Sequence, residues 1–464
     1  MAKGYLPYSI DQRLLLPPDM REWLPEGHLA LFLLDVVSEL DLSAIERVYQ
    51  AKDTRGRAGY HPVMMVAVLL YAYCVGKPSS RRIERATYED VAFRVLAGDQ
   101  HPDHDSIASF RKLHLAALSG LFMQVLRLCQ KAGLVKLGHI SIDGTKVKAN
   151  ASKHKAMSYE RMSETEKKLE DEVARLLAEA ERVDAEEDAL HGKGKRGDEL
   201  PKELKRREDR LVKIREAKAA LEREAREKAE AKAAEVAEKL AERAREEADT
   251  GKKARGPEPK APDPDQSAPE PKAQRNFTDP ESRIMPDGAN KGAFVQAYNA
   301  QIAVDGEAQI IVATLMVQTP NDVQQLVPMA AAIVANVGQL AEVTSADAGY
   351  FSANNINDPA LSNTNLLVPP HREKHGAAPS LAPLEKDASP AQRMRHKLSS
   401  DEHRALYKRR KAIVEPVFGQ IKEVRGFRRL LLRGLSAARD EFNLIALTHN
   451  LLKLFRAGAR PAFA

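Results

Sequence analysis

The chain has 464 residues, a formal net charge of +6 and a pI near 9.0. Two or three structural units are expected at this length, and the 30% charged fraction is above the usual quarter. Two cysteines, Cys74 and Cys129, are too few for a disulfide framework or a structural zinc site, so they are expected to be buried thiols in a reducing cytoplasm. No run of about twenty apolar residues and no signal-peptide layout is present, so a cytoplasmic location without a membrane partner is predicted.

Residues 1–135 are predicted to form a helical N-terminal DNA-binding domain. Apolar residues at helical spacing predict helices over 28–49 and 62–76. Two short helices with a turn at Gly98 then resemble a helix-turn-helix arrangement, although an ordinary helical bundle with a charged surface is an open alternative. Basic residues on these short helices are the candidate DNA contacts: Arg81, Arg82, Arg85, Arg111 and Lys112.

Residues 158–250 are rich in Ala, Glu, Lys, Arg and Leu. Apolar positions step by three and four over 169–183 and again over 204–225, which predicts two long helices folded back as a coiled-coil hairpin insertion. Charged helix faces are usually only solvated, so no catalytic role is expected, and both dimerisation and DNA contact stay open. The Pro-rich stretch at 251–274 predicts a flexible or extended linker.

Strand patterns occur on both sides of the insertion, so residues 136–157 and 275–455 are predicted to form one α/β domain. The expected fold is a mixed sheet with flanking helices, in which the first three strands form a meander and later strands pair in parallel. Asp143 and Asp347 lie late in predicted strands, where the chemistry of such sheets gathers. If the two strands are neighbours, both carboxylates reach the same edge of the sheet.

Glu415 is the third candidate acid, because it lies within the apolar stripe of a predicted helix, where an unpaired carboxylate is costly. The segment DEHRALYKRRKAIVEPVFGQIKEVRGF is predicted to form one long helix. Because Pro416 follows Glu415 directly, a helix that begins near Glu415, with a separate helix upstream, is the open alternative. Three carboxylates at one sheet edge suit magnesium, and two such ions roughly 4 Å apart can assist an in-line displacement at phosphorus. Each acid also has a structural alternative, with Asp143 in a turn, Asp347 as a helix cap and Glu415 as an exposed helix-start acid.

These acids also carry a family resemblance. Asp143 in SIDGTKVKANAS, Asp347 in SADAGYFS and Glu415 in IVEPVFGQIK resemble the Asp, Asp and Glu motifs of DDE transposases from bacterial insertion sequences. The segments RIMPDGANKGAFVQAYNAQIAVD and YHPVMMVAVLLYAYCVGKPSSRRIE are similar to other regions of that group. The resemblance implies an RNase H-like catalytic domain in which the three acids are catalytic and bind two magnesium ions, with manganese as a substitute. It also implies cleavage at transposon ends and strand transfer by the released 3′ hydroxyl.

Residues around the third acid are the remaining DNA-binding candidates: Tyr407, Arg410, Lys411 and Lys422. Tyr407 and Arg410 keep the family's mutual spacing, but Arg410 lies five residues before Glu415 instead of four, a position that Lys411 occupies. The insertion also falls between the first two strands, whereas many relatives insert after the fifth. The prediction is therefore a transposase that acts as a homo-oligomer on double-stranded DNA, at transposon ends and target. A DNA-binding structural or regulatory protein with an inactive RNase H-like domain, and a stand-alone nuclease, are the alternatives.

Overall fold

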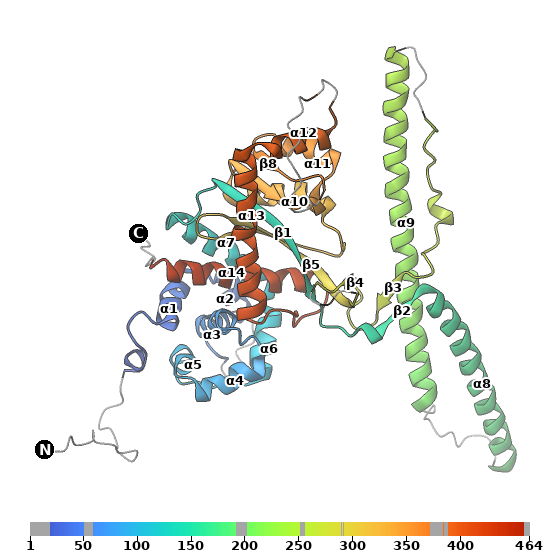
Figure 1. The fold of residues 1–464 in the computed structure, drawn as a ribbon. Helices are drawn as coiled ribbons and strands as arrows, with labels where there is room; N and C mark the ends of the chain where they lie inside the picture. The colour runs from blue at the N-terminus through green and yellow to red at the C-terminus, as the bar shows by residue number, and fades with distance from the viewer. Residues whose placement is uncertain are drawn as a thin grey trace, which may run out of the picture. The chain divides into compact units, whose positions relative to one another are not determined.

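The structure is a computed structural model of the 464-residue chain. It describes residues 19–50, 59–191, 202–250, 256–288, 290, 292–371, 384 and 388–458. The chain divides into two compact units, of which the first comprises Met1–Lys148 with Tyr298–Ala464 and the second Ala149–Ala297. The architecture is mixed α/β and mostly helical (Figure 1). Each unit is described by itself below.

A mixed sheet forms the centre of the first unit. Its strands are β1 (His139–Lys148), β5 (Phe294–Asp305), β6 (Ile311–Val317), β7 (Val343–Ala346) and β8 (Asn365–Leu367). The full sheet has six strands in the order β4–β5–β1–β7–β8, and β6 also pairs with β5. The strand β4 (Arg283–Pro286) pairs antiparallel with the start of β5, and these paired residues belong to the second unit. The β5–β6 pair is antiparallel, whereas β1, β7 and β8 are parallel neighbours. The structure therefore confirms the predicted adjacency of the first three strands and the parallel pairing of the later ones.

Strand β1 is longer than the sequence indicated, because it continues through Asp143 and Gly144 to Lys148. Gly144 permits this course. A Cβ atom at this position would lie 2.3 Å from Nε2 of Gln301 and 2.8 Å from Oδ1 of Asp322, closer than nonbonded atoms can approach. Asp143 therefore lies inside a strand and not at its end or in a turn.

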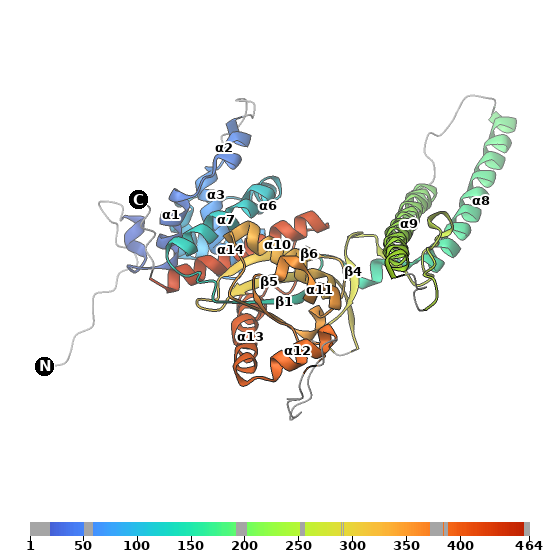
Figure 2. The same ribbon diagram turned by 90° about the horizontal axis from the view of Figure 1, so that it is seen from above.

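Helices cover both faces of the sheet (Figure 2). These helices are α10 (Leu326–Val337), α11 (Ala353–Asn357), α12 (Pro390–Ser399), α13 (Asp401–Gly419) and α14 (Leu435–Arg456). Helices α10 and α14 pack against β6, while α13 packs against β1 and β7 on the other side. Asn450 of α14 joins helix to sheet, because its side chain accepts a hydrogen bond from the Ile311 amide at 2.9 Å and donates one to the Ile311 carbonyl at 2.8 Å.

Helix α13 is continuous through Pro416, so the predicted long helix is confirmed as far as Gly419 and the alternative start near Glu415 is wrong. Proline has no N–H group for the carbonyl one turn earlier, which is that of Ala412. Nε2 of Gln309 donates to this carbonyl at 2.9 Å and replaces the missing hydrogen bond. A π-helical turn (Gln420–Val424) follows α13 directly.

The N-terminal helices pack on the C-terminal helix α14. They are α1 (Leu29–Glu39), α2 (Ser43–Gln50), α3 (Pro62–Cys74), α4 (Ser80–Glu89), α5 (Val91–Leu96), α6 (His104–Leu113) and α7 (Leu115–Lys131). Helices α3 and α7 contact α14, and both cysteines are buried, as predicted. Gly98, with φ 57°, separates α5 from α6 at the predicted turn. The domain boundary after residue 135 falls inside the first unit and stays a prediction.

Among the described helices, none alone is both long and apolar enough to cross a membrane, and only the bent pair His104–Leu113 and Leu115–Lys131, at 69°, passes the same test together.

The second unit contains the two long helices that the sequence predicted. Helices α8 (Tyr159–His191) and α9 (Lys202–Thr250) pack together as a hairpin (Figure 1), and the short strands are β2 (Ala156–Ser158), β3 (Gln274–Asn276) and β4 (Arg283–Pro286). The Pro-rich stretch contains a 3₁₀ turn (Pro264–Gln266) that packs on α9, and Arg243 of α9 donates to the carbonyl of Gly256 at 2.8 Å. At the base of the unit, the Ala149 amide donates to the Gln296 carbonyl at 2.9 Å, so its entry and exit strands are neighbours. Supercoiling of the two helices stays a prediction.

Candidate active site

Asp143 and Asp347 are brought together by two neighbouring strands. The parallel register of β1 and β7 pairs Ile142 with Ala346, so the two aspartates are the next residues along each strand. Both line one cavity of about 870 Å³. The arrangement places two carboxylates at the same edge of the sheet, as the sequence predicted.

Glu415 lines the same cavity from helix α13. Arg404, Tyr407 and Lys411 line it too, and their spacing of three and four residues along the helix leads to Glu415 on the same face. Glu415 itself is exposed, whereas the apolar residues Ile413, Val414 and Val417 are buried. Its expected position within the buried stripe is therefore wrong, and its carboxylate is open to solvent in the cavity.

Asp143 forms a buried ion pair with Arg410. Nη1 of Arg410 donates to Oδ2 of Asp143 at 3.1 Å, and the two side chains are 9% and 20% exposed. The guanidinium also lies 5.9 Å from the centre of the Tyr407 ring. Burial raises the pKa of Asp143 to about 6; Arg410 opposes this rise and the charge of Asp347 adds to it. Arg410, expected to contact DNA, thus has its closest charged partner inside the site.

Asp347 also caps the turn that follows it. Its Oδ1 accepts a hydrogen bond from the Gly349 amide at 2.8 Å and begins a 3₁₀ turn (Ala348–Tyr350). The structural alternative, a cap, is therefore present together with the position in the cavity. Ala348 and Gly349 line the cavity as well, so small residues lie beside the carboxylate.

A fourth carboxylate, that of Asp322, was missed by sequence reasoning. It follows β6 and accepts hydrogen bonds from the amides of Asn299 and Gln301, each at 2.6 Å, while Lys146 lies 3.5 Å away. The Tyr350 hydroxyl donates to Gln301 in the same network. Burial lowers the pKa of Lys146, although Asp322, Asp143 and Asp347 all act to raise it. An acid after a strand was the signal that found Asp347, and it could have found Asp322.

The other predicted DNA-binding residues lie apart from the cavity. Arg81, Arg82 and Lys112 are exposed, and Arg85 pairs with Glu89 at 2.7 Å. Their contacts with DNA stay predictions.

Arg111 and Lys422 form hydrogen bonds with other residues of the chain. Arg111 is only 6% exposed and donates to the carbonyl of Pro78 at 2.6 Å, because the surrounding helices enclose it. Its guanidinium therefore stabilises the fold instead of facing solvent. Lys422 donates to the Lys146 carbonyl at 3.0 Å and to the Thr145 hydroxyl, which ties the π-helical turn to β1.

The donor chemistry of the cavity fits a hard divalent cation. Asp143, Asp347 and Glu415 offer carboxylate oxygens, the ligands that magnesium prefers. Asp143 is desolvated and repelled by Asp347, so a cation beside the two would stabilise both charges. Among the described residues, no three His, Cys, Asp or Glu side chains lie close enough together to hold a metal ion. The pair of aspartates is thus the part of the site that the fold brings together.

Two family models match separate parts of the chain. Residues 18–113 match a family described as a transposase domain (DUF772), and residues 372–455 match one described as a transposase DDE domain. The second match includes Glu415, Tyr407 and Arg410, whereas Asp143 and Asp347 lie outside both matches. No curated protein and no solved structure matches the chain.

Proposed function

The two matches support a DDE-type transposase of an insertion element, and we propose that this chain cleaves DNA at the ends of its element and transfers the released strand to target DNA. The observation that carries the proposal is the placement of Asp143 and Asp347 at adjacent positions of parallel strands, in one cavity with Glu415. A homo-oligomer on double-stranded DNA is part of the same proposal.

The sheet supports an RNase H-like fold for the catalytic domain. Its order β4–β5–β1–β7–β8, with β6 paired antiparallel to β5, ends in two parallel additions to β1, and helices cover both faces. In sheets of this kind, functional groups gather where parallel strands end side by side. Asp347 follows such a strand, and Asp143 lies beside it.

The residues of the cavity have distinct proposed roles. Asp143 and Asp347, with Glu415 as the third ligand, would hold magnesium or manganese. When bound, the ions supply the charge that activates an attacking oxygen and stabilises the leaving oxygen at phosphorus. Arg404 and Lys411 line the same cavity with positive charge, which attracts a phosphodiester backbone. Arg410 holds Asp143 in place and neutralises it before a cation arrives.

Neutral, near-isosteric variants of the three acids test the proposal. We expect Asp143→Asn, Asp347→Asn and Glu415→Gln each to reduce magnesium-dependent cleavage of end-containing DNA by about a hundredfold or more, a size typical of losing a charge-stabilising group. Binding of the same DNA in EDTA should persist, because these residues hold the cation and not the DNA backbone. Glu402→Gln is the matched control, since Glu402 is an exposed acid of α13 outside the cavity. Cleavage that survives in all three variants would contradict the proposal.

Assays with the same protein and DNA distinguish the proposal from two alternatives. An inactive DNA-binding protein is favoured by one observation, that no three described metal-ligating side chains lie within metal-binding reach of one another. Cleavage by the unaltered chain excludes it. A stand-alone nuclease cleaves but does not join, so pre-cut ends incubated with target DNA distinguish it from a transposase by the joined product.

A further inference from the structure

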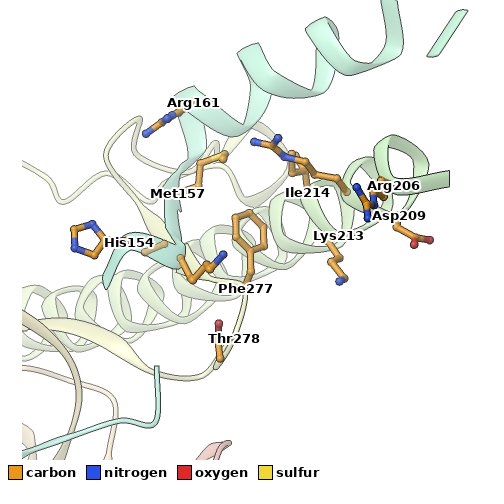
Figure 3. Close-up of a pocket in the computed structure, with 12 residues that line it drawn as sticks. His154, Met157, Arg161, Arg206, Asp209, Lys213, Ile214, Phe277 and Thr278 are labelled. Carbon is orange, nitrogen blue, oxygen red and sulfur yellow. The ribbon is translucent and has the colours of Figure 1, made fainter. Parts of the chain in front are cut away.

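The second unit contains a cavity of about 750 Å³ that the reaction above does not use. It lies where β2 and the start of α8 meet the first turns of α9 and the residues after β3 (Figure 3). Its basic side chains are those of His154, Lys155, Arg161, Arg206, Arg210 and Lys213, against the single acid Asp209. The cavity is therefore strongly positive.

The Lys and Arg side chains at this cavity have no acidic partner in the part of the chain that the structure describes, whereas several other cations of the hairpin do. Elsewhere Arg207 pairs with Glu172 at 2.9 Å, Lys218 with Glu166 at 2.9 Å and Arg226 with Asp265 at 2.9 Å. Within the described residues, the five Lys and Arg side chains at the cavity form no ion pair with any acid, and all five are exposed. Five positive charges without described acidic partners are thus gathered around one cavity, whereas other unpaired cations of α9, such as Lys228 and Lys232, lie outside it.

The wall behind these charges is part of the hairpin core. Ile214 is 1% exposed in that core, and Met157 and Phe277 pack against it. Figure 3 shows the Phe277 ring between Met157 and Ile214, with the basic side chains around them. The backbone that carries the cations is therefore fixed by packing, and a bound anion would meet a preformed site.

The spacing of the charges fits a repeated anion. Arg206, Arg210 and Lys213 lie four and three residues apart, on one face of α9 and over roughly 10 Å of its axis at 1.5 Å per residue. Phosphates of one DNA strand recur about every 3.4 Å along the duplex, so this row can face about three of them. An arginine can also bind a phosphate through two parallel hydrogen bonds. A single small anion cannot make these bonds with both arginines of the row and also contact the lysine, whereas successive phosphates of a DNA strand can.

We propose that this cavity is a second binding site for the phosphodiester backbone of double-stranded DNA, carried by the insertion. The inference rests on the proposed function, because that function makes DNA the polyanion that the chain handles. Two roles were open for the insertion, contact with DNA and dimerisation. This proposal assigns it contact with DNA.

Removal of three charges from the cavity tests the site. The full-length variant Arg206→Ala/Arg210→Ala/Lys213→Ala is compared with Lys228→Ala/Lys232→Ala/Arg245→Ala, which removes the same charge from exposed positions of the same helix outside the cavity. Binding of a fluorescent duplex is measured in EDTA as a function of salt. We expect the slope of log K against log[salt] to fall by about 2–3 in the cavity variant, since each phosphate contact contributes about 0.9. The control should keep the slope of the unaltered chain, and equal slopes in both variants would overturn the inference.

A thiol label gives a direct second readout. Cys74 and Cys129 are buried, so in a Thr278→Cys variant maleimide reacts with the new thiol at the cavity. Duplex DNA should slow this labelling several-fold, and polyglutamate of equal charge concentration should not. Equal protection by polyglutamate would overturn the assignment to nucleic acid. Both experiments use Asp143→Asn as the background, so DNA binding is measured without cleavage. An unchanged salt slope together with unslowed labelling would contradict this inference alone, whereas the proposed function is tested separately by cleavage with the unaltered chain.

Discussion

At the scale of single residues, the pair of Asp143 and Arg410 governs the charge of the proposed catalytic site. Buried ion pairs gain little over apolar packing, but removal of one partner is costly because it leaves an uncompensated charge. Burial and the neighbouring Asp347 already disfavour ionisation of Asp143, and Arg410 opposes both effects. A divalent cation would act on Asp143 in the same direction as Arg410.

We therefore expect Arg410→Ala to destabilise the metal-free protein by about 3 kcal/mol or more, as for other broken buried pairs. Magnesium should raise the melting temperature of this variant more than that of the unaltered chain, because the unpaired carboxylate gains more from the ion. Calorimetry with EDTA and with magnesium measures both effects. Lys408→Ala, at an exposed position on the same helix, should respond to magnesium like the unaltered chain. An equal magnesium effect in Arg410→Ala would show that the pair and the ion do not share a site.

The identity of these residues was accessible from the sequence, but their pairing was not. Asp143 and Glu415 stand out as acids beside apolar residues, whereas Arg410 was identified by its spacing from Tyr407 in the family resemblance. The hydrogen bond between Arg410 and Asp143 spans 267 residues, and no local spacing encodes it. Arg410 was consequently assigned to DNA, and Asp322 was not identified.

At the scale of elements, β1 depends on one residue that lacks a side chain. Gly144 lets the strand pass Gln301 and Asp322, whose side chains belong to the network behind the two proposed catalytic aspartates. A methyl group there has to displace a buried amide and a carboxylate, and overpacking of this kind costs typically 1–3 kcal/mol.

The variant Gly144→Ala should accordingly lower the free energy of unfolding by about 1–3 kcal/mol and reduce cleavage, while DNA binding in EDTA persists. Urea unfolding and the cleavage assay measure the two effects. Gly120→Ala is the matched control, because a Cβ at this exposed position of α7 meets nothing within 4 Å. There alanine should stabilise the helix by up to about 1 kcal/mol. Unchanged stability and cleavage in Gly144→Ala would contradict the close approach at this position.

Element positions followed from apolar periodicity, but their ends did not. The helices at 62–76 and 159–250, and the β5–β6 hairpin, were predicted because burial on one face leaves a regular pattern. The course of α13 through Pro416 was not predictable in this way. Gln309, which supplies the missing hydrogen bond, is 103 residues away and adopts a φ of 58° at its own position.

At the scale of the whole molecule, two buried histidines link folding to pH. Burial, with the charge of Arg409, lowers the pKa of His139 to about 4, and burial, with that of Arg425, lowers the pKa of His449 to about 3. Each pKa is below the ordinary value of 6.5. The unfolded chain therefore takes up protons near pH 6.5 that the folded chain refuses, and stability is lost as pH falls from about 6.5 towards 4.

Urea unfolding at pH 7.5 and pH 5 checks this sign. The two histidines together should account for a loss of up to about 4 kcal/mol, at roughly 1.4 kcal/mol per histidine for each pH unit below 6.5. Asp143 acts in the opposite sense, because its raised pKa adds stability as pH falls through about 6. The comparison is therefore made with His139→Asn/His449→Gln, whose free energy of unfolding should depend less on pH. The control is His396→Gln at an exposed site, whose free energy of unfolding should depend on pH as in the unaltered chain. Equal pH dependence in all three proteins would contradict the assignment.

The hydrogen bond between Ala149 and Gln296 has a consequence for how the insertion can be replaced. Because the insertion leaves and returns at adjacent backbone positions, its length is independent of the span it bridges, and closure entropy grows only slowly with length. The insertion can therefore be exchanged as one unit. A short turn, or a foreign domain whose termini are close together, could replace the insertion between Ala149 and Gln296. The gap between β1 and β5 that the replacement has to bridge would stay the same.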